Sequence, residues 1–545
     1  MVPLSTRDGH PAVRLLHNGR IYSSAAAQPA TALVLIDERI GYVGSDAGAR
    51  ALASGAPEVD LGGRLVTPAF VDAHVHIIQT GQVIRGLDLH GARSKDDVLG
   101  ELRRYAAAHP GRRIIVGQGW DERHWPDPRP PTRAELDQAA SGIAVYLARV
   151  DVHSAVVSTA LLDQLPEVTA ADGYRPDGLV SREAHHLVRG RMDRLFSDAE
   201  RRSDATVALR RAAAAGVGSV HDMGGPHLGP IEDIERVREA AADVGIRLVS
   251  YWGELASEDT LALARSIGVA GLAGDLCIDG AIGSRTAALS RSYSDQESGA
   301  AVGARYLSGD EIAGHIIECT RAGVQAGFHC IGDDAVAAAV DGFRHAGSVV
   351  GAAALRRRHH RLEHVEMAAE ADFPVLAEYG VTVSMQPAFD ALWGGPGELY
   401  EQRLGVDRAA GMNRCGSLRR AGVPLAFGTD SPVTPLAGWD TVRAAVSHWR
   451  PGERMGVADA FAAATIDAHR AGLVHHVGLL QAGWQADFAV LDPEAGADVD
   501  PSGLPRIGAG PPPSCWATVV AGRQIYGPAD SGLPTQEAPE SGAPR

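Results

Sequence analysis

The stretch TPAFVDAHVHI, residues 67–77, decides the fold. Its apolar run leads into His74 and His76, and the period-two geometry of a strand puts both side chains on one face. When such a strand opens a parallel barrel, its carboxyl end lies at the mouth, where barrel enzymes act. Two neutral imidazoles there can bind one metal ion. The pair alone is weak evidence, because two ordinary polar histidines at a strand end give the same pattern.

Downstream, apolar strand-like runs alternate with Ala-rich helical stretches, which is the pattern of a (β/α)8 TIM-type barrel in an α/β protein. The gap between the first two strand candidates, residues 85–205, is too long for one crossover and predicts an inserted subdomain that acts as a lid or substrate wall. The strand candidates are residues 69–76, 217–222, 247–251, 276–279, 325–329, 361–364, 382–385 and 425–429.

Both chain ends carry short β-branched runs separated by Gly and Asn-Gly turns, which predicts a small β-sandwich formed from the two ends together. The last residues are rich in Pro, Ser, Glu and Gly and predict a disordered tail. The expected parts are a sandwich from 1–66 and 481–527, a barrel over 67–480 that holds the 85–205 insertion, and a tail over 528–545.

Composition restricts the partners. The 545-residue chain has a formal net charge of −16, so binding to nucleic acid is not expected. Its five cysteines are scattered without a CxxC pair, which argues against a disulfide framework and favours a reducing, cytoplasmic compartment. No apolar run is long enough for a membrane span. A small-molecule substrate is expected, and homodimerisation stays open.

Three later strand-like runs also end in residues that can bind a metal. These are His329 in QAGFHCIGD, His364 in RLEHVEM and Asp430 in LAFGTDSP. Together with His74 and His76, they form a zinc-type set of four histidines and one aspartate at the ends of barrel strands. Five such residues at five matching positions are hard to explain as capping or core residues.

The motifs together resemble the amidohydrolase superfamily, and within it the YtcJ-like branch (amidohydrolase family 3), which includes N-substituted formamide deformylases. The resemblance spans nearly the whole chain, but it does not specify a substrate. It is carried by PAFVDAHVH (68–76), GQGWDERHWP (117–126), VDVHSAVVSTALL (150–162), PDGLVSRE (176–183), DGAIGSRTAAL (279–289), FHCIGDDAV (328–336), RLEHVE (361–366) and GTDSPV (428–433).

The resemblance implies that the five residues hold one or two metals, with His364 and Asp430 as catalytic residues. Asp430 would accept the proton of the activated water and pass it to the leaving amine. Many relatives bridge two metals with a carbamylated lysine, but the matching position here is Asp275, and the single lysine, Lys95, lies in the insertion. A missing bridge leaves a second cation poorly compensated, so one ion, most simply zinc, is expected.

Further residues have alternative interpretations. Asp275, Cys277 and Asp279 alternate along the chain, so each could bind metal or support the ligands, although a cysteine here also suits a small buried apolar position. The substrate-binding candidates could equally serve loop packing or internal ion pairs. They are Trp120, Asp121, His153 and Arg285.

The leading functional hypothesis is hydrolysis of a carbon–nitrogen bond outside peptides, in an amide-like or formamide-like small molecule, by metal-activated water. Hydrolytic deamination or cyclic-amide opening on the same scaffold is an alternative. A metal-binding barrel without turnover is a third hypothesis, but such a barrel would not need Asp430 beside the histidines.

Overall fold

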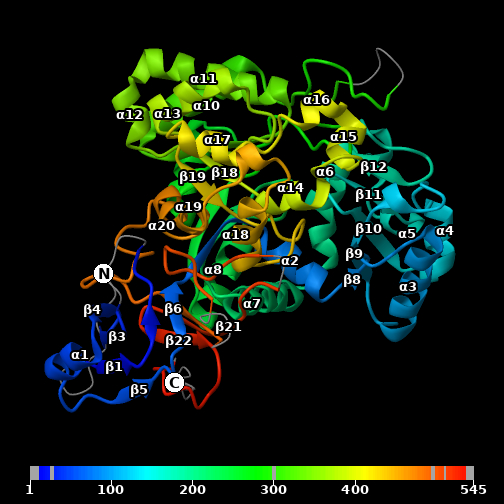
Figure 1. Cartoon of the computed structure of the whole chain (residues 1–545). Coiled ribbons are helices and arrows are strands. Elements are labelled where there is room, and N and C mark those ends of the chain that lie inside the picture. The colour runs from blue at the N-terminus through cyan, green and yellow to red at the C-terminus, as the bar shows by residue number, and fades with distance from the viewer. Residues whose placement is uncertain (1–10, 25–29, 297–301, 493–497, 509–510, 536–545) are drawn as a thin grey trace.

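A computed structural model describes residues 11–24, 30–296, 302–492, 498–508 and 511–535. Figure 1 shows a central barrel, an inserted subdomain packed against one side of it, and a smaller β unit where the two chain ends come together.

The barrel is one eight-stranded parallel sheet in which neighbouring strands follow one another along the chain. The first and last strands meet where the Asp430 amide donates to the His74 carbonyl at 2.8 Å, so the sheet closes on itself. The strands are β7 (Phe70–Val75), β13 (Val217–Gly224), β14 (Arg247–Trp252), β15 (Gly271–Leu272), β16 (Gln325–Cys330), β17 (Arg361–His364), β18 (Thr382–Met385) and β19 (Leu425–Phe427).

The fourth strand differs from the prediction. The hydrogen-bonded pairing is at Gly271–Leu272 and not at 276–279. Gly274 then has a φ of +83°, and a Cβ there would lie 2.7 Å from the Met223 sulfur, so the chain leaves the ladder. It touches the sheet again only at a single bridge between Cys277 and His329. Beyond this break, Asp275 lies at the barrel mouth, within 3.7 Å of His74, His76 and His329.

Helices surround the barrel. In α7, Ser197 and Glu200 form a capping box, and Ala205, Ala208 and Ala212 bury one face. The barrel helices are α2 (Ile77–Ile84), α7 (Asp198–Ala214), α8 (Glu232–Val244), α9 (Glu258–Ile267), α10 (Gly309–Ala322), α11 (Asp333–Val350), α12 (Ala352–Arg356), α13 (Phe373–Tyr379), α14 (Pro387–Trp393), α15 (Leu399–Leu404), α16 (Val406–Ala409), α17 (Cys415–Arg420), α18 (Trp439–Val446), α19 (Val457–Ala463) and α20 (Ile466–Ala471).

The insertion has its own five-stranded sheet, seen at the right of Figure 1. Its two faces carry separate apolar clusters, because Ile115 of one strand faces one cluster while its neighbours Ile114 and Val116 face the other. The strands are β8 (Leu87–Asp88), β9 (Ile114–Trp120), β10 (Ala144–Arg149), β11 (Ser154–Val157) and β12 (Leu179–Ser181), with helices α3 (Lys95–Ala108), α4 (Arg133–Ala140), α5 (Thr159–Leu162) and α6 (Arg182–Arg191).

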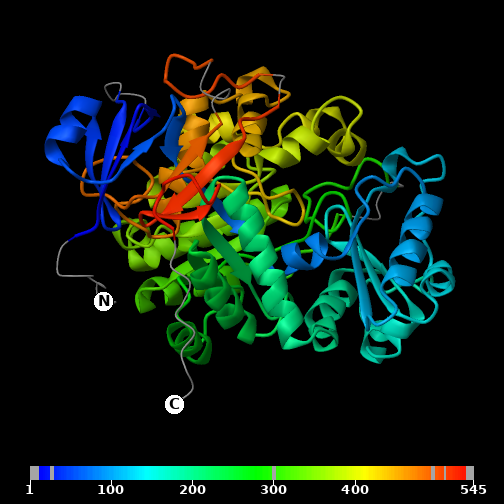
Figure 2. The same cartoon turned by 90° about the horizontal axis from the view of Figure 1, so that it is seen from below.

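The small β unit is a sandwich of two sheets built from both chain ends, and Figure 2 shows the last strands beside the first. Val66 pairs with Val490, and the core between the sheets takes Leu33 from one end and Phe488 from the other. The strands are β1 (Val13–His17), β3 (Ala32–Ile36), β4 (Arg39–Gly44) and β5 (Glu58–Asp60) in one sheet, and β2 (Arg20–Ile21), β6 (Leu65–Pro68), β20 (Phe488–Leu491), β21 (Cys515–Val520) and β22 (Arg523–Tyr526) in the other, with helix α1 at Asp46–Leu52.

The predicted disordered tail is corrected in its first part. Residues 528–535 have a defined place, because the Gln524 amide donates to the Pro534 carbonyl and Leu533 is buried in the sandwich core. An apolar contact therefore outweighs the polar composition of this stretch. Residues 536–545, the rest of the predicted tail, lie outside the described residues.

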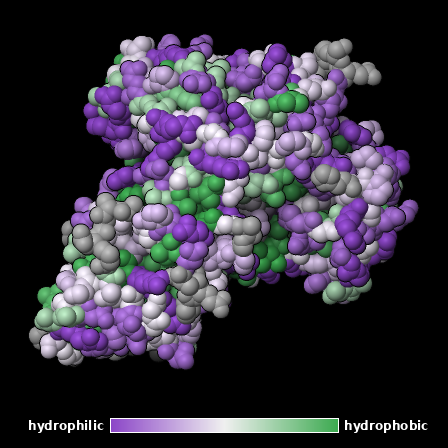
Figure 3. Space-filling view, viewed as in Figure 1, coloured by the Kyte–Doolittle hydropathy of each residue, from purple (hydrophilic) through white to green (hydrophobic). Residues whose placement is uncertain are grey.

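The visible surface is mostly hydrophilic, with apolar side chains gathered over α14 and α18 (Figure 3). Ala388, Leu392 and Ala444 line an open groove there. Within the described ranges, no helix has the length and apolar character needed to cross a membrane.

Candidate active site

Six buried side chains meet at the barrel mouth, where the carboxyl ends of the parallel strands come together. Asp430 follows β19, and one of its oxygens lies 3.1 Å from His76 Nε2 and 3.4 Å from His74 Nε2. The remaining three side chains of the cluster are His329 in β16, His364 at the end of β17 and Asp275 after β15. The structure therefore brings together all five predicted metal ligands and adds Asp275.

Asp275 lies at the centre of the cluster. Its Oδ1 is 3.5 Å from His74 Nε2 and 3.7 Å from His329 Nδ1, and its Oδ2 is 3.3 Å from His76 Nε2. Three sets of potential ligand atoms lie within binding distance of one another, and two of them share Asp275. The aspartate at the position of the lysine in many relatives thus faces the same space as the histidines.

Each imidazole is held through its outer nitrogen by an oxygen that only accepts hydrogen bonds. That nitrogen must therefore carry the proton, which leaves the lone pair of the other nitrogen directed at the cluster. The pairs are His74 Nδ1 with the Glu363 carboxylate (2.8 Å), His76 Nδ1 with the Met223 carbonyl (2.9 Å), His364 Nδ1 with Gln386 Oε1 (2.7 Å) and His329 Nε2 with the Gly280 carbonyl (3.3 Å).

This arrangement fits a divalent cation. Imidazole lone pairs face carboxylate oxygens, an unfavourable contact unless a positive charge lies between them. Three of these buried atoms, His74 Nε2, His364 Nε2 and Asp275 Oδ1, have no hydrogen-bond partner in the described chain. Protons can substitute for a metal: burial acts to lower the pKa of His76, but Asp275 and Asp430 outweigh it and raise that pKa to about 9.

A fully buried ion pair lies behind His74. Arg361 Nε donates to Glu363 Oε1 at 2.6 Å, while the other oxygen of Glu363 receives the His74 proton. Arg361 also donates to the Ala73 carbonyl at 2.7 Å and lies over the Tyr251 ring. Burial acts to raise the pKa of Glu363, but the Arg361 charge and His74 hold it well below its ordinary value. Glu363 is therefore an ionised acceptor that fixes the tautomer of His74.

The backbone is unusual at the same strand ends. His364, Val365 and Asp430 have φ values of +70°, +52° and +53°. Left-handed conformations are rare for residues other than glycine and costly for a β-branched one such as Val365. The turn at 364–365 lets His364 and Glu366 line the same pocket.

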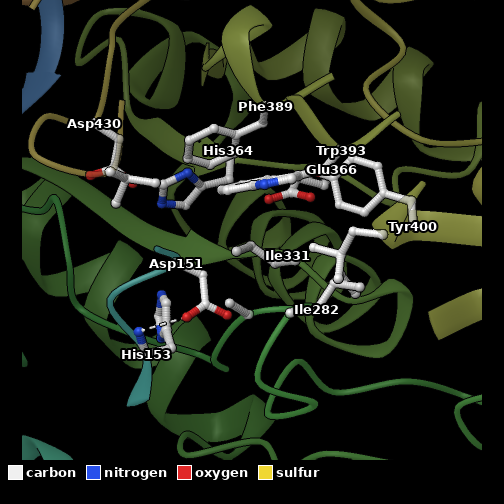
Figure 4. A pocket seen from close by; sticks show the side chains of 14 residues that line it. Asp151, His153, Ile282, Ile331, His364, Glu366, Phe389, Trp393, Tyr400 and Asp430 are labelled. Atoms are coloured by element: carbon white, nitrogen blue, oxygen red, sulfur yellow. Dashed lines mark hydrogen bonds between the residues drawn. The ribbon is translucent and has the colours of Figure 1, made fainter. Parts of the chain in front are cut away.

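That pocket is a narrow slot beside the cluster, and the about 350 Å³ of space between its atoms includes open solvent. Figure 4 shows Asp430, His364 and Phe389 along one side, with Asp151, His153 and Ile282 facing them across the space. The Phe389 ring is parallel to the His364 imidazole within 10°. The other lining residues are Ala281, Gly283, Ile331, Glu366, Trp393, Leu399, Tyr400 and Val433.

Of the four substrate-binding candidates, the structure places His153 in the slot and the other three outside it. Trp120 is fully buried in the insertion core and donates to the Leu147 carbonyl at 2.9 Å. Asp121 pairs with arginines of the insertion. Arg285 pairs with Asp295 at 2.6 Å. These three side chains have partners within the chain, and none of them lines the slot.

Asp279 and Cys277 belong to no set of potential ligands among the described residues. Asp279 accepts three backbone hydrogen bonds, from Ala288, Ile331 and Gly332, and so anchors the loops around His329. The Cys277 thiol donates to the Asp275 carbonyl at 3.4 Å, and burial raises its pKa well above the ordinary value. Asp279 thus supports the site, and Cys277 stays a neutral thiol.

Sequence reasoning missed several residues of the site. Glu363 directly precedes His364 in RLEHVE and Glu366 follows it by two positions, and this closeness in sequence is the one local signal that could have indicated them. Phe389 and Trp393 come from α14 at helical spacing, a pattern that is more often ordinary core.

A closed parallel barrel with a buried imidazole and carboxylate cluster at its mouth defines a metal-dependent hydrolase. The sequence matches the amidohydrolase family over residues 57–526, and the chain belongs to this family. The solved metal-dependent hydrolase of Pyrococcus horikoshii OT3 is 25% identical, with a TM-score of 0.71 over 91% of this chain and 100% of that one.

Three relatives match along most of their length. Protein LONG AFTER FAR-RED 3 of Arabidopsis thaliana is 26% identical over 94% of this chain and 91% of its own. YtcJ of Bacillus subtilis (strain 168) is 26% identical over 86% and 90%. The N-substituted formamide deformylase of Arthrobacter pascens is 24% identical over 85% and 90%.

Proposed function

We propose that the protein hydrolyses a carbon–nitrogen bond outside peptides, in an amide-like or formamide-like small molecule. The observation that carries this proposal is Asp430, whose carboxylate faces the lone pairs of His74 and His76 at the slot. The name of the Arthrobacter pascens relative, a formamide deformylase, supports the same bond type.

The four histidines, Asp430 and Asp275 would hold the ion. A divalent ion bound there polarises a carbonyl and lowers the pKa of water to about 7. Asp430 then accepts the proton of the attacking water and returns it to the leaving nitrogen. His153 is kept neutral by burial, which lowers its pKa, so one of its ring nitrogens can donate a hydrogen bond to a substrate oxygen.

We propose one ion per chain, most simply zinc, which suits sites rich in imidazole. Asp275 and Asp430 together balance one divalent charge. A second ion would bring two more positive charges, and the described residues of the cluster add no further carboxylate in contact with the imidazole lone pairs.

Replacement of Asp430 by Asn tests the proposal. The variant keeps the shape and removes the basic oxygen, so we expect turnover to fall by at least about 10²-fold while most of the metal stays bound. The matched control is Asp341→Asn, which changes an exposed aspartate paired with Arg344. If Asp430 only shaped its turn, the variant would lose stability, and turnover per folded molecule would stay normal. That result would remove Asp430 from the mechanism.

A further inference from the structure

We propose that Glu366 determines substrate specificity by accepting a hydrogen bond from a hydroxyl or amine at the far end of an apolar, ring-containing group of the substrate. The inference rests on the proposed hydrolysis, because it assigns the part of the substrate that does not react. It concerns the end of the slot away from the metal cluster.

The slot has two chemically different ends. In Figure 4, Asp430 lies at one end and Tyr400 at the other, with Trp393 and Glu366 between His364 and Tyr400. The walls between the two ends are apolar, from Ile282, Ile331, Phe389, Leu399 and Val433. A flat apolar ring would bury its surface there, at about 25 cal/mol for each Å² removed from water.

The far end carries polar atoms whose hydrogen bonding is incomplete. Glu366 is 4% exposed and Tyr400 is 2% exposed, and the Tyr400 hydroxyl lies close enough to Glu366 and Asn413 to shift its own pKa and that of Glu366, but none of these contacts in the described chain has good hydrogen-bond geometry. Asn413 lies behind them, since its amide donates to the Glu366 carbonyl at 2.9 Å, and its side-chain nitrogen also has no hydrogen bond of good geometry in the described chain. Buried polar groups are normally paired with good geometry, so a hydrogen-bond donor on a bound molecule would complete this group.

The charged residues that line the slot determine which substituent of a substrate can bind at this end. Among the described residues, Asp151, Glu366 and Asp430 line the slot, and no lysine or arginine does. Asp151 is matched by Arg149 at 3.1 Å, whereas Glu366 has no cation beside it in the described chain. An anionic substituent is therefore disfavoured at this end, because it would lose its water without gaining a cation. A hydrogen-bond donor is favoured, because one oxygen of Glu366 is an acceptor whether the group is ionised or not.

The test compares three formanilides with zinc-loaded enzyme: one with a para hydroxymethyl group, one with the isosteric para ethyl group and one with a para carboxylate. We expect the hydroxymethyl compound to exceed the ethyl compound in kcat/KM by at least about 10-fold, because the ethyl group leaves buried polar atoms unpaired. The carboxylate should be the poorest substrate.

Two variants test whether Glu366 accepts the hydrogen bond. Glu366→Met removes the acceptor and should abolish or reverse the preference for hydroxymethyl. Glu366→Gln keeps an oxygen and should retain most of this preference. Glu370→Met, which changes an exposed residue four positions on, is the control and should leave the preference unchanged.

Equilibrium binding of the matching anilines, followed by calorimetry, keeps this inference separate from the hydrolysis itself. If the wild type binds 4-hydroxymethylaniline more tightly than 4-ethylaniline, and Glu366→Met does not, the inference holds even where no formanilide is cleaved, and only the proposed reaction fails. If formanilides are cleaved with the same ratios in the wild type and Glu366→Met, the inference is overturned and the reaction stands. Failure of the wild type to bind or cleave any of the compounds also overturns it.

Discussion

Replacement of Glu363 by Gln should damage both the fold and the metal site, although the residue contacts no substrate. Glu363 and Arg361 are both fully buried, and Glu363 also receives the His74 proton. Gln keeps the shape but leaves the Arg361 charge uncompensated, and breaking such a pair from one side costs about 3–5 kcal/mol. Losing the partner of a metal-binding histidine typically weakens metal affinity about 10–100-fold.

Thermal unfolding of chelator-treated protein isolates the first effect, because no bound metal then contributes to stability. Zinc competition with a calibrated chelator measures the second. The matched control is Glu318→Gln, the same change in an exposed pair with Arg321 at 2.9 Å, which should cost under about 1 kcal/mol. Adding Arg361→Met to Glu363→Gln should recover part of the lost stability. A Glu363→Gln protein with unchanged melting temperature and zinc affinity would refute the reasoning.

Three other predictions follow from the charges and the topology. Elemental analysis of protein purified without added metal should give about one zinc per chain, and two full equivalents would contradict the charge balance of Asp275 and Asp430. Deletion of residues 515–526 removes β21 and β22, exposes the edge of β20 and the sandwich core, and should give insoluble protein, so a soluble and active truncation would contradict the shared sandwich. Burial raises the pKa of Asp390 from 3.8 to about 7, so its carboxyl favours the folded state below pH 4 and this contribution is lost as the pH rises through 7. Asp390→Asn should therefore gain stability relative to the wild type by about 1–3 kcal/mol more at pH 8 than at pH 5, and equal melting-temperature differences at both would contradict this.

The barrel could be predicted from the sequence because its strands are continuous apolar runs that end in polar residues. The exception is instructive. LCID, residues 276–279, alternates like a strand, but the ladder pairs at Gly271–Leu272 and breaks at Gly274. The alternation of apolar and polar residues is a property of the side chains. Strand pairing instead needs a backbone that stays beside its neighbour, and Gly274 turns the backbone away from the neighbouring strand.

The substrate pocket was less predictable, because it depends on which face of each loop packs inward. Trp120 and Arg285 are the residue types that often bind ligands, yet Leu147 and Asp295 already satisfy them. Phe389 looks like ordinary helix core and lines the slot instead. Residue type indicates what a side chain can do, and its partners, which come from distant parts of the chain, decide whether it is free to do it.

The same dependence on distant partners explains how the metal site is held. The outer nitrogens of the four histidines are bound by groups that follow or belong to strands other than their own: β17 for His74, β13 for His76, β15 for His329 and β18 for His364. Each contact fixes which nitrogen is free, so the direction of every lone pair depends on the position of another strand of the barrel. Two of these partners are backbone carbonyls that no side-chain substitution can remove, whereas Glu363 and Gln386 can be changed. Of these four partners, Glu363 and Gln386 are therefore the two where substitution should weaken metal affinity, although neither contributes a ligand atom.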